Sequence, residues 1–224
     1  MSGSGNSGYE SRRVSMNPDP REALGRILPE LRRGSVVLLP ADTIYGLSCR
    51  WDSQRGRDRI QALKGPGRLS MFVALVSSRE MVFQYAESPG AEGLRILDEQ
   101  WPGPVTVVLR ARPQAAPEFC LSSDGTVAFR WPRSPFLQEL VRDLGVPLVS
   151  TSANRTGEGH ATTASGAWDL FGAGIDLYVD GGTLAGPAST LLDLTGDHPH
   201  LLRLGGALPG GELPGPPPNG ATRK

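Results

Sequence analysis

The sequence has few of the residues that build metal centres and disulfide frameworks. It contains two cysteines, Cys49 and Cys120, and three histidines among 224 residues. Two cysteines without metal-ligand spacing are typical of buried free thiols, and the His198-x-His200 pair beside a proline is a weak zinc signal. We therefore expect that protein side chains hold no metal ion.

Long hydrophobic runs are also lacking. No stretch approaches the roughly 18 apolar residues that a membrane-spanning helix needs. The N-terminal residues lack the apolar core of a signal peptide. We expect no membrane association and a cytoplasmic location.

An excess of charge of one sign is missing as well. The 23 Lys and Arg residues balance the 23 Asp and Glu residues, so the formal net charge is zero. Non-specific nucleic-acid binding depends on a basic surplus, and this balance argues against it unless the charges segregate on one face. Lysine itself is scarce: Lys64, in front of a Gly/Pro loop, and Lys224 are the two in the chain.

Common nucleotide-binding and hydrolase motifs are absent. The sequence has no Gly-x-x-x-x-Gly-Lys-Ser/Thr loop, and Gly172-Ala173-Gly174 does not open a helix after a strand. The few histidines fit no Ser-His-Asp pattern. These observations exclude a P-loop, a dinucleotide fingerprint and a serine hydrolase, and no internal repeat is present.

Glycine and proline are plentiful, with 29 and 20 residues, and part of this excess lies at the chain ends. Residues 1–20 are rich in Ser, Gly and Asn without apolar periodicity, and residues 209–224 are rich in Pro and Gly. We expect both ends to be disordered tails. Residues 21–208 then form one domain, for which the hydrophobic content of 38% is sufficient.

Apolar periodicity predicts alternating helices and strands within that domain. We expect helices over 21–33, 52–64, 78–85, 91–100, 134–144 and 163–171, and strands over 35–39, 71–76, 105–109, 126–131, 146–149, 175–179, 191–194 and 201–205. This alternation predicts an α/β fold, a twisted mixed sheet flanked by helices. Ligands of open α/β sheets bind beyond the strand ends, where we expect a concave polar cleft.

One polar stretch directly follows an apolar run. Ser150-Thr151-Ser152-Ala153-Asn154 places three hydroxyls and a carboxamide after residues 146–149. The pattern suits a small-molecule site, and it equally suits a strand-to-helix turn capped by Ser, Thr and Asn. Residue type alone leaves both interpretations open.

Three further residues have a structural and a functional interpretation. Thr43 is able to cap a turn or to contact a polar substrate. Lys64 suits a helix C-terminus by the helix dipole, and it equally offers a compact charge to a polyphosphate. Arg130, in an otherwise apolar strand, needs an anionic partner; Asp42 is an internal candidate, and a substrate phosphate or carboxylate is the interpretation we prefer.

These segments occur in the order of a known family. The ordered set consists of residues 40–47, 64–68, 101–106, Arg130 before Pro132, Ser189-Thr190 and Arg203. From about Gly34 to Gly206 it resembles the Sua5/YrdC family of threonylcarbamoyl-adenylate synthases. Its most specific pieces are Tyr-Gly-Leu, Pro-Gly-Pro-x-Thr and Thr-Ser-Ala-Asn.

The resemblance implies a YrdC-like single domain with an enzymatic activity. Members of the family condense L-threonine, bicarbonate or CO2, and ATP into threonylcarbamoyl-AMP and pyrophosphate, and Mg2+ enters with ATP. The product feeds the t6A modification of adenosine 37 in tRNA by partner proteins. We therefore expect ATP, L-threonine and bicarbonate as ligands, and possible contacts with tRNA and other t6A-modification proteins.

The resemblance also implies roles for particular residues. Those expected to meet the reacting groups are Lys64, Arg68, Ser152 and Asn154; those expected to bind substrate are Thr43, Thr106, Arg110, Arg130, Ser189 and Arg203. Within this set Lys64, Arg68 and Arg203 would offset phosphate charge, and Thr43 and Arg110 would hold threonine.

The sequence departs from the family at two positions. Ala41 stands where most relatives have threonine, and Pro66 replaces the arginine of a Lys-x-Arg pattern. We expect Arg68, two residues further on, to replace that cation. These departures leave two alternatives open, a drifted nucleotide-binding paralogue and a non-catalytic RNA-binding module.

Overall fold

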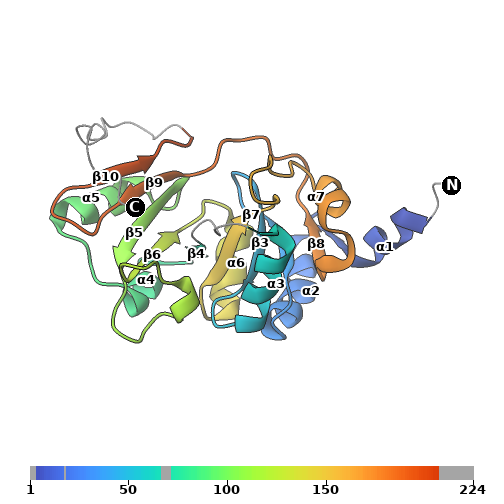
Figure 1. The fold of residues 1–224 in the computed structure, drawn as a ribbon, viewed down its shortest axis with the longest axis horizontal. Coiled ribbons are helices and arrows are strands. Elements are labelled where there is room, and N and C mark those ends of the chain that lie inside the picture. The colour runs from blue at the N-terminus through green and yellow to red at the C-terminus, as the bar shows by residue number, and fades with distance from the viewer. Residues whose placement is uncertain (1–3, 18, 67–71, 207–224) are drawn as a thin grey trace.

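The computed structural model describes residues 4–17, 19–66 and 72–206 (Figure 1). Its strands are β1 (Arg13–Ser15), β2 (Val37–Pro40), β3 (Tyr45–Arg50), β4 (Val73–Leu75), β5 (Val105–Arg110), β6 (Thr126–Arg130), β7 (Leu148–Ser152), β8 (Leu177–Asp180), β9 (Thr190–Asp193) and β10 (His200–Arg203). They form one ten-stranded sheet in the order β1-β8-β2-β3-β7-β4-β6-β5-β9-β10. The expected α/β domain with one large sheet is confirmed.

The sheet is mixed, as predicted. Parallel pairing joins β1 to β8, β2 to β8, β4 to β6 and β5 to β9. Antiparallel pairing joins β2 to β3, β3 to β7, β4 to β7, β5 to β6 and β9 to β10. The central strand β7 therefore lies between two antiparallel neighbours, which bring residues from both halves of the sheet beside its polar end.

The helices are α1 (Ser4–Arg12), α2 (Pro20–Arg32), α3 (Gln54–Lys64), α4 (Arg79–Tyr85), α5 (Ala91–Gln100), α6 (Pro135–Leu144) and α7 (Ala164–Phe171). Five of them begin with a side chain that accepts a hydrogen bond from a backbone N–H of the first turn, at Asp19, Ser53, Ser78, Ser134 and Thr163. Gly145 ends α6 in the left-handed conformation, with φ of 77°. These caps explain why most predicted helices agree with the structure to within two residues.

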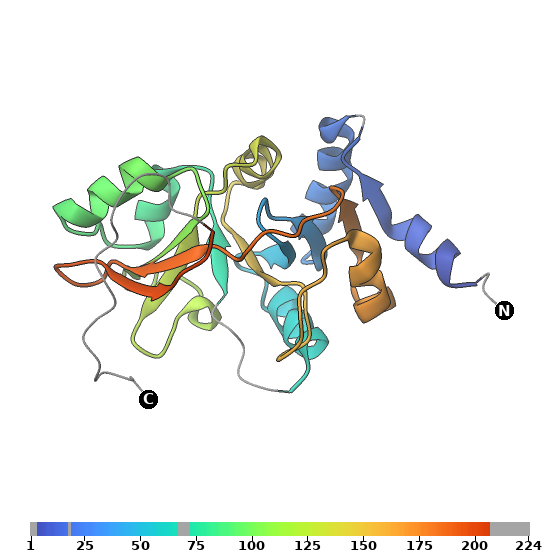
Figure 2. The ribbon, with the colours of Figure 1, turned by 90° about the horizontal axis from the view of Figure 1, so that it is seen from above.

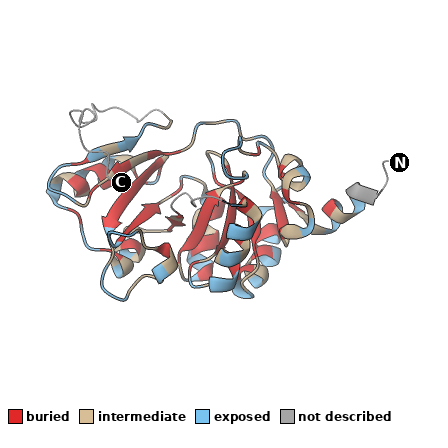
Figure 3. Ribbon diagram, in the orientation of Figure 1, coloured by how far each residue is buried: buried red, intermediate tan, exposed pale blue. Residues whose placement is uncertain are grey.

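Two apolar layers cover the faces of the sheet. Leu39 and its neighbours in β2 alternate between faces, and α2 and α6 pack on one face through Ile27, Leu31 and Leu140. Helices α3 and α7 cover the opposite face, where Leu38, Leu47 and Ile60 are fully buried. Figure 2 shows these two helix pairs on opposite sides of the strands, and Figure 3 shows the buried residues concentrated in the sheet between them.

Residues 4–15 correct the expectation of a structureless N-terminal tail. They form α1 and β1, and β1 pairs in parallel with β8 at the edge of the sheet. Tyr9 packs against the rings of Trp168 and Tyr178. The segment lacks apolar periodicity because one aromatic side chain and one strand edge, rather than a helical stripe, attach it to the domain. The predicted C-terminal tail, 209–224, lies outside the described residues.

Two strands differ from the sequence prediction. Strand β3 was not predicted, because Pro40 and Asp42 indicated a loop, whereas Tyr45–Arg50 folds back antiparallel to β2. Strand β7 continues through Ser152, so the polar motif forms the end of the strand itself.

In the part of the chain that the structure describes, none of the helices combines the length and the hydropathy needed to cross a bilayer.

Candidate functional site

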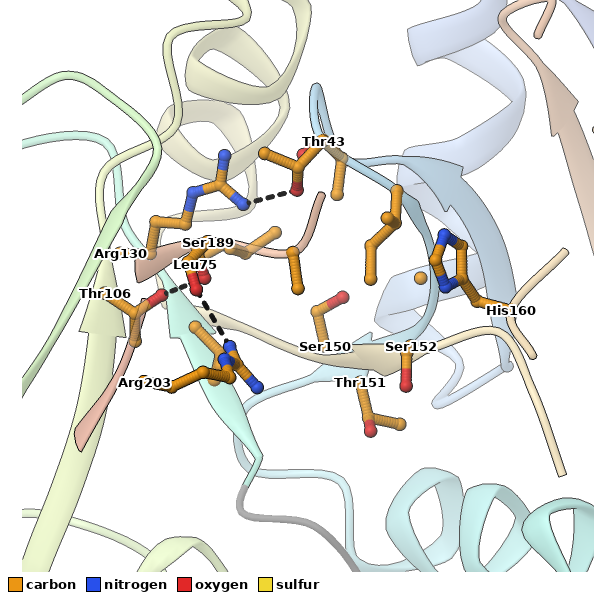
Figure 4. Close-up of a pocket in the computed structure, with 15 residues that line it drawn as sticks. Thr43, Leu75, Thr106, Arg130, Ser150, Thr151, Ser152, His160, Ser189 and Arg203 are labelled. Atoms are coloured by element: carbon orange, nitrogen blue, oxygen red, sulfur yellow. Dashed lines mark hydrogen bonds between the residues drawn. The ribbon is translucent and has the colours of Figure 1, made fainter. Parts of the chain in front are cut away.

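A pocket of about 220 Å³ lies beside the end of β7, with residues of β3 on one side of that strand and of β4, β5 and β6 on the other. Figure 4 shows its side chains, which come from the β2–β3 turn, six strands and the loops beside β7 and β9. The polar residues that line it are Thr43, Thr106, Arg130, Ser150, Thr151, Ser152, His160, Ser189 and Arg203. Two arginines, one histidine and no carboxylate belong to its described lining, so the pocket suits an anionic ligand.

The end of β7 forms the floor of this pocket. Ser150 pairs with Ser48 of β3, whose hydroxyl donates to Ser150 Oγ over 3.1 Å. Gly46, on the same strand, faces Ser150 so closely that a Cβ there would overlap Ser150 Oγ. Glycine at this position therefore leaves room for the hydroxyl row, and residues 150–152 all line the pocket.

Lys64, expected at a phosphate, is not among the residues that line the pocket. Its side chain is buried beneath the end of β7, and Nζ donates to Ser152 O at 2.9 Å, Asn154 O at 3.1 Å and Asn154 Oδ1 at 3.0 Å. An ammonium group has three donors, and all three are used. Burial lowers the pKa of Lys64 to about 8. Lys64 therefore anchors the polar motif from behind.

Asn154 belongs to the same internal cluster. Its Oδ1 also accepts from Ser152 Oγ at 2.6 Å, and its Nδ2 donates to Arg155 O and Glu158 O. The side chain thus organises the loop after β7, as the turn-capping interpretation requires, and it is not among the pocket-lining residues. Ser152 does reach the pocket, where its oxygen keeps capacity to accept.

Arg130 has an internal partner, Asp42, the internal candidate that the sequence offered beside a substrate anion. Its guanidinium donates to Asp42 Oδ1 and to Thr43 Oγ1, both at 2.9 Å, and to Gly103 O at 3.2 Å. Burial raises the pKa of the Asp42 carboxyl, and the charge of Arg130 partly offsets this. Arg130 still lines the pocket, where it orients the hydroxyl of Thr43, as the dashed line in Figure 4 shows.

A second polar cluster lies at the β5–β9–β10 side of the pocket. Thr106 Oγ1 and Ser189 Oγ are 2.7 Å apart, and Arg203 donates to Ser189 O at 3.0 Å. Gly205 lies against the backbone of Ala188 and Ser189. The last hairpin thereby brings Arg203, expected near the nucleotide, beside two hydroxyls that were expected there as well.

Other expected site residues lie elsewhere. Arg110 is exposed at the far end of β5 and lines a separate hollow with Glu87 and Asp197.

Ala41 is a pocket-lining residue, so its departure from the family pattern concerns the site directly. Pro66 is exposed just after the end of α3, and Arg68 lies outside the described residues.

Sequence reasoning missed His160, which lines the pocket from the loop after β7. The sequence signal for it is its position in a polar loop next to the motif. Among the described residues no group of three His, Cys, Asp or Glu could hold a metal ion.

Comparison with known proteins agrees with these observations. A family model described as "Sua5_yciO_yrdC: Telomere recombination" matches residues 30–205. Proteins named threonylcarbamoyl-AMP synthase are similar: the one from Thiobacillus denitrificans is 39% identical over 73% of this chain and 87% of its own length. The one from Bacillus subtilis is 35% identical over 84% of this chain and 54% of its own length, and the one from Pyrococcus abyssi is 31% identical over 79% and 52%. This chain thus spans about half the length of the last two relatives.

Solved structures share the fold. The crystal structure of P. abyssi Sua5 complexed with L-threonine superposes with a TM-score of 0.79 at 28% identity, covering 87% of this chain and 57% of that one. The crystal structure of E. coli YciO superposes with a TM-score of 0.78 at 25% identity, covering 87% and 94%. With a family match over most of its length, this chain belongs to the Sua5/YciO/YrdC family.

Proposed function

We propose that this protein is an L-threonylcarbamoyladenylate synthase, which converts L-threonine, bicarbonate or CO2, and ATP into threonylcarbamoyl-AMP and pyrophosphate. The observation that carries the proposal is a pocket with two arginines, a row of hydroxyls and no carboxylate among its described lining residues, in a chain whose relatives bear this name. The chain covers 87% of the T. denitrificans relative, which supports the proposal that a domain of this size is sufficient for the activity.

The reaction requires reactants to be positioned and charge to be neutralised. The threonine amine attacks the carbon of CO2, and the resulting carbamate oxygen attacks the α-phosphorus of ATP, from which pyrophosphate leaves. Positioned cationic and hydrogen-bonding groups stabilise such a transition state. Arg203 uses one N–H on Ser189 O in the structure, so most of its five donors remain for phosphate oxygens. Mg2+ would enter with ATP and neutralise further charge.

Threonine would bind near Thr43 and Arg130. Thr43 Oγ1 accepts from Arg130 and donates to Ala41 O at 3.2 Å, so its remaining lone pair has a fixed direction. The relative from P. abyssi has been solved with L-threonine, which supports an amino-acid site in this fold. We propose Thr43 for threonine, and Thr106, Ser152 and Ser189 for the phosphates or adenosine. Downstream, the product would serve t6A formation in cytoplasmic tRNA.

The test is pyrophosphate release by the purified protein with each substrate omitted in turn. We expect release only when ATP, L-threonine and bicarbonate are all present, with threonylcarbamoyl-AMP identified by mass spectrometry. Release that does not depend on threonine would contradict the proposal. ATP binding without turnover would favour the drifted paralogue instead.

Arg203→Gln links the activity to this pocket. We expect a fall of roughly 10-fold or more in kcat/KM for ATP, because a hydrogen bond to a charged group contributes about 1.5–3 kcal/mol. Arg142→Gln, at an exposed arginine of α6, is the matched control and should leave kcat/KM unchanged. Equal activity of the two variants would exclude Arg203 from the nucleotide site.

A further inference from the structure

His160 combines three features that the proposed reaction can use. It is partly buried, it lines the pocket, and Figure 4 shows it across the pocket from Thr106, Ser189 and Arg203. The nucleotide-side cluster is therefore at the other end of the site. His160 lies on the same side of the pocket as Ser152, proposed above for the phosphates, where the carbamate of threonine would form next to the phosphate that it attacks.

The imidazole of His160 is available to a ligand. Neither ring nitrogen has a hydrogen-bond or ion-pair partner among the residues that the structure describes, and Figure 4 draws no interaction to it. Of the described lining residues, the others are apolar, hydroxyl-bearing or arginine. Neither a hydroxyl nor a guanidinium accepts a proton near neutral pH, whereas an imidazole does. Lys64, the nearby amine, has all its donors on the β7 end.

The loop that carries His160 is held in place on both sides. Asn154 Nδ2 donates to Glu158 O at 2.8 Å, Thr156 N donates to Lys64 O at 3.0 Å, and Ala161 N donates to Ala153 O at 2.8 Å. The Lys64–Asn154 cluster, which does not reach the pocket itself, thus holds the backbone of the loop on either side of His160. A general base needs such a fixed position within hydrogen-bond reach of its substrate.

We propose that His160 is the general base of carbamate formation, an inference that rests on the proposed function. The lone pair of the threonine amine forms the C–N bond to CO2, and one C=O electron pair moves onto oxygen. The nitrogen then loses a proton, which an imidazole nitrogen of His160 accepts. The products of this step are a carbamate and an imidazolium, which returns its proton to solvent before the next turnover.

The charged groups around His160 are cationic on the pocket side. Its own loop carries Arg155 and Glu158, Lys64 lies behind that loop, and Arg130 and Arg203 line the pocket that His160 faces. A carbamate formed next to them would be attracted by the arginines, which favours the step.

The experiment compares wild type with His160→Asn and His160→Ala in the pyrophosphate assay at saturating ATP. We expect kcat to fall roughly 100-fold or more in both variants, since general bases contribute about 10²-fold or more. If wild type loses activity at acidic pH, that loss should be smaller in both variants, because neither carries the imidazole. Imidazole added to His160→Ala should restore part of kcat, and the KM for ATP and the melting temperature should stay unchanged. His198→Asn, at an exposed histidine with 82% of its side chain accessible, is the matched control.

Failure of the inference and failure of the proposed function look different. If wild type releases no threonine-dependent pyrophosphate, the function itself is wrong and the role of His160 falls with it. If wild type is active and both His160 variants keep its kcat and its pH profile, the general-base role alone is overturned. A rise in KM for ATP with unchanged kcat would also overturn it, because it would place His160 at the nucleotide.

Discussion

At the scale of single residues, the two most recognisable polar groups of the motif region act behind the pocket. Lys64 satisfies two backbone carbonyls and one carboxamide oxygen at the end of β7. Asn154 connects that lysine to the loop that carries His160. Their contribution to activity would therefore be to hold Ser152 and His160 in position.

Lys64→Met tests this role, because it keeps the apolar stem and removes the three donors. We expect the free energy of unfolding to fall by about 2 kcal/mol or more, since buried acceptors would lose their partners. Urea denaturation measures the change. Arg55→Met, at an exposed position of the same helix, should cost almost nothing. A fully stable Lys64→Met protein that lacks only activity would instead place Lys64 at the phosphates.

At the scale of elements, the β9–β10 hairpin decides whether the pocket has its nucleotide side. Its two strands place Arg203 against the Ser189 carbonyl, and Thr190 Oγ1 accepts from Gly205 N at 3.0 Å. The backbone approaches closely here, because Gly205 has no side chain to separate residues 188–190 from the end of β10. The hairpin lies at the edge of the sheet, so β5 is the one strand that pairs with it.

Gly205→Ala should therefore displace the end of β10. A Cβ would overlap the backbone of Ala188 and Ser189, which a rotamer change cannot relieve. We expect a loss of stability of about 1–3 kcal/mol and a higher KM for ATP. Gly196→Ala, in the turn of the same hairpin, has open space apart from one atom at 3.9 Å and serves as the control. Identical melting curves for both variants would contradict the close approach.

At the scale of the whole molecule, the N-terminal segment adds a strand to the edge of the sheet. It also contacts the Asp180–Gly182 turn, which in turn bonds Tyr45 beside the site. Arg13 forms an ion pair of 2.7 Å with Asp180, and Met16 N donates to Asp180 O at 3.1 Å. The next residues, Gly181 and Gly182, bond the hydroxyl of Tyr45. In the sequence, Tyr45 lies between Ile44 and Gly46, which both line the pocket. The N-terminal segment therefore supports the wall of the pocket through Asp180 and the two glycines.

Deletion of residues 1–16 should destabilise the protein, in contrast to what the composition of the segment suggests. Tyr9 and Val14 are buried at 8% and 4% exposure. Losing their contacts should lower the free energy of unfolding by about 2 kcal/mol, after allowance for the chain entropy regained. Thermal unfolding measures it, and Tyr9→Ala in the full chain should reproduce part of the loss. An unchanged melting temperature would show that the segment adds no stability.

Alkaline pH should also destabilise the fold. Burial raises the pKa of the Cys49 thiol from 9.0 and that of the Tyr45 phenol from 10.0, both to about 12. The folded state thus keeps protons that the unfolded state releases, so stability falls as pH rises from about 9 towards 12. Lys64, with its lowered pKa, acts in the opposite direction between about 8 and 10.5. It is one group against at least four, because burial also raises the pKa of the Cys120 thiol and the Tyr178 phenol.

Urea denaturation at several pH values between 8 and 11 checks this expectation. Cys49→Ala should be less stable at every pH but should show a shallower decline, because one of the proton-retaining groups is gone. A decline as steep as that of wild type would mean that Cys49 does not contribute to it.

The residues by themselves determined most elements of the domain and the place of the polar motif. Apolar periodicity and helix caps are local properties, so α2, α5 and α6 agreed with their predictions. The alternation of helices and strands predicted the mixed sheet, and the order of the polar motifs along the chain indicated the family. Composition failed for residues 4–15, because their partners lie more than 150 positions away in the sequence.

Only the tertiary structure decided what each polar side chain faces. A strand advances about 3.3 Å per residue, which separates Arg110 from Thr106 by roughly 13 Å and removes it from the pocket. Lys64 and Arg130 found internal acceptors, because a buried cation takes the nearest oxygen that the packing provides. His160 reached the pocket for the converse reason: the anchored loop after β7 leaves its imidazole without a partner of its own, facing the space where a ligand would bind.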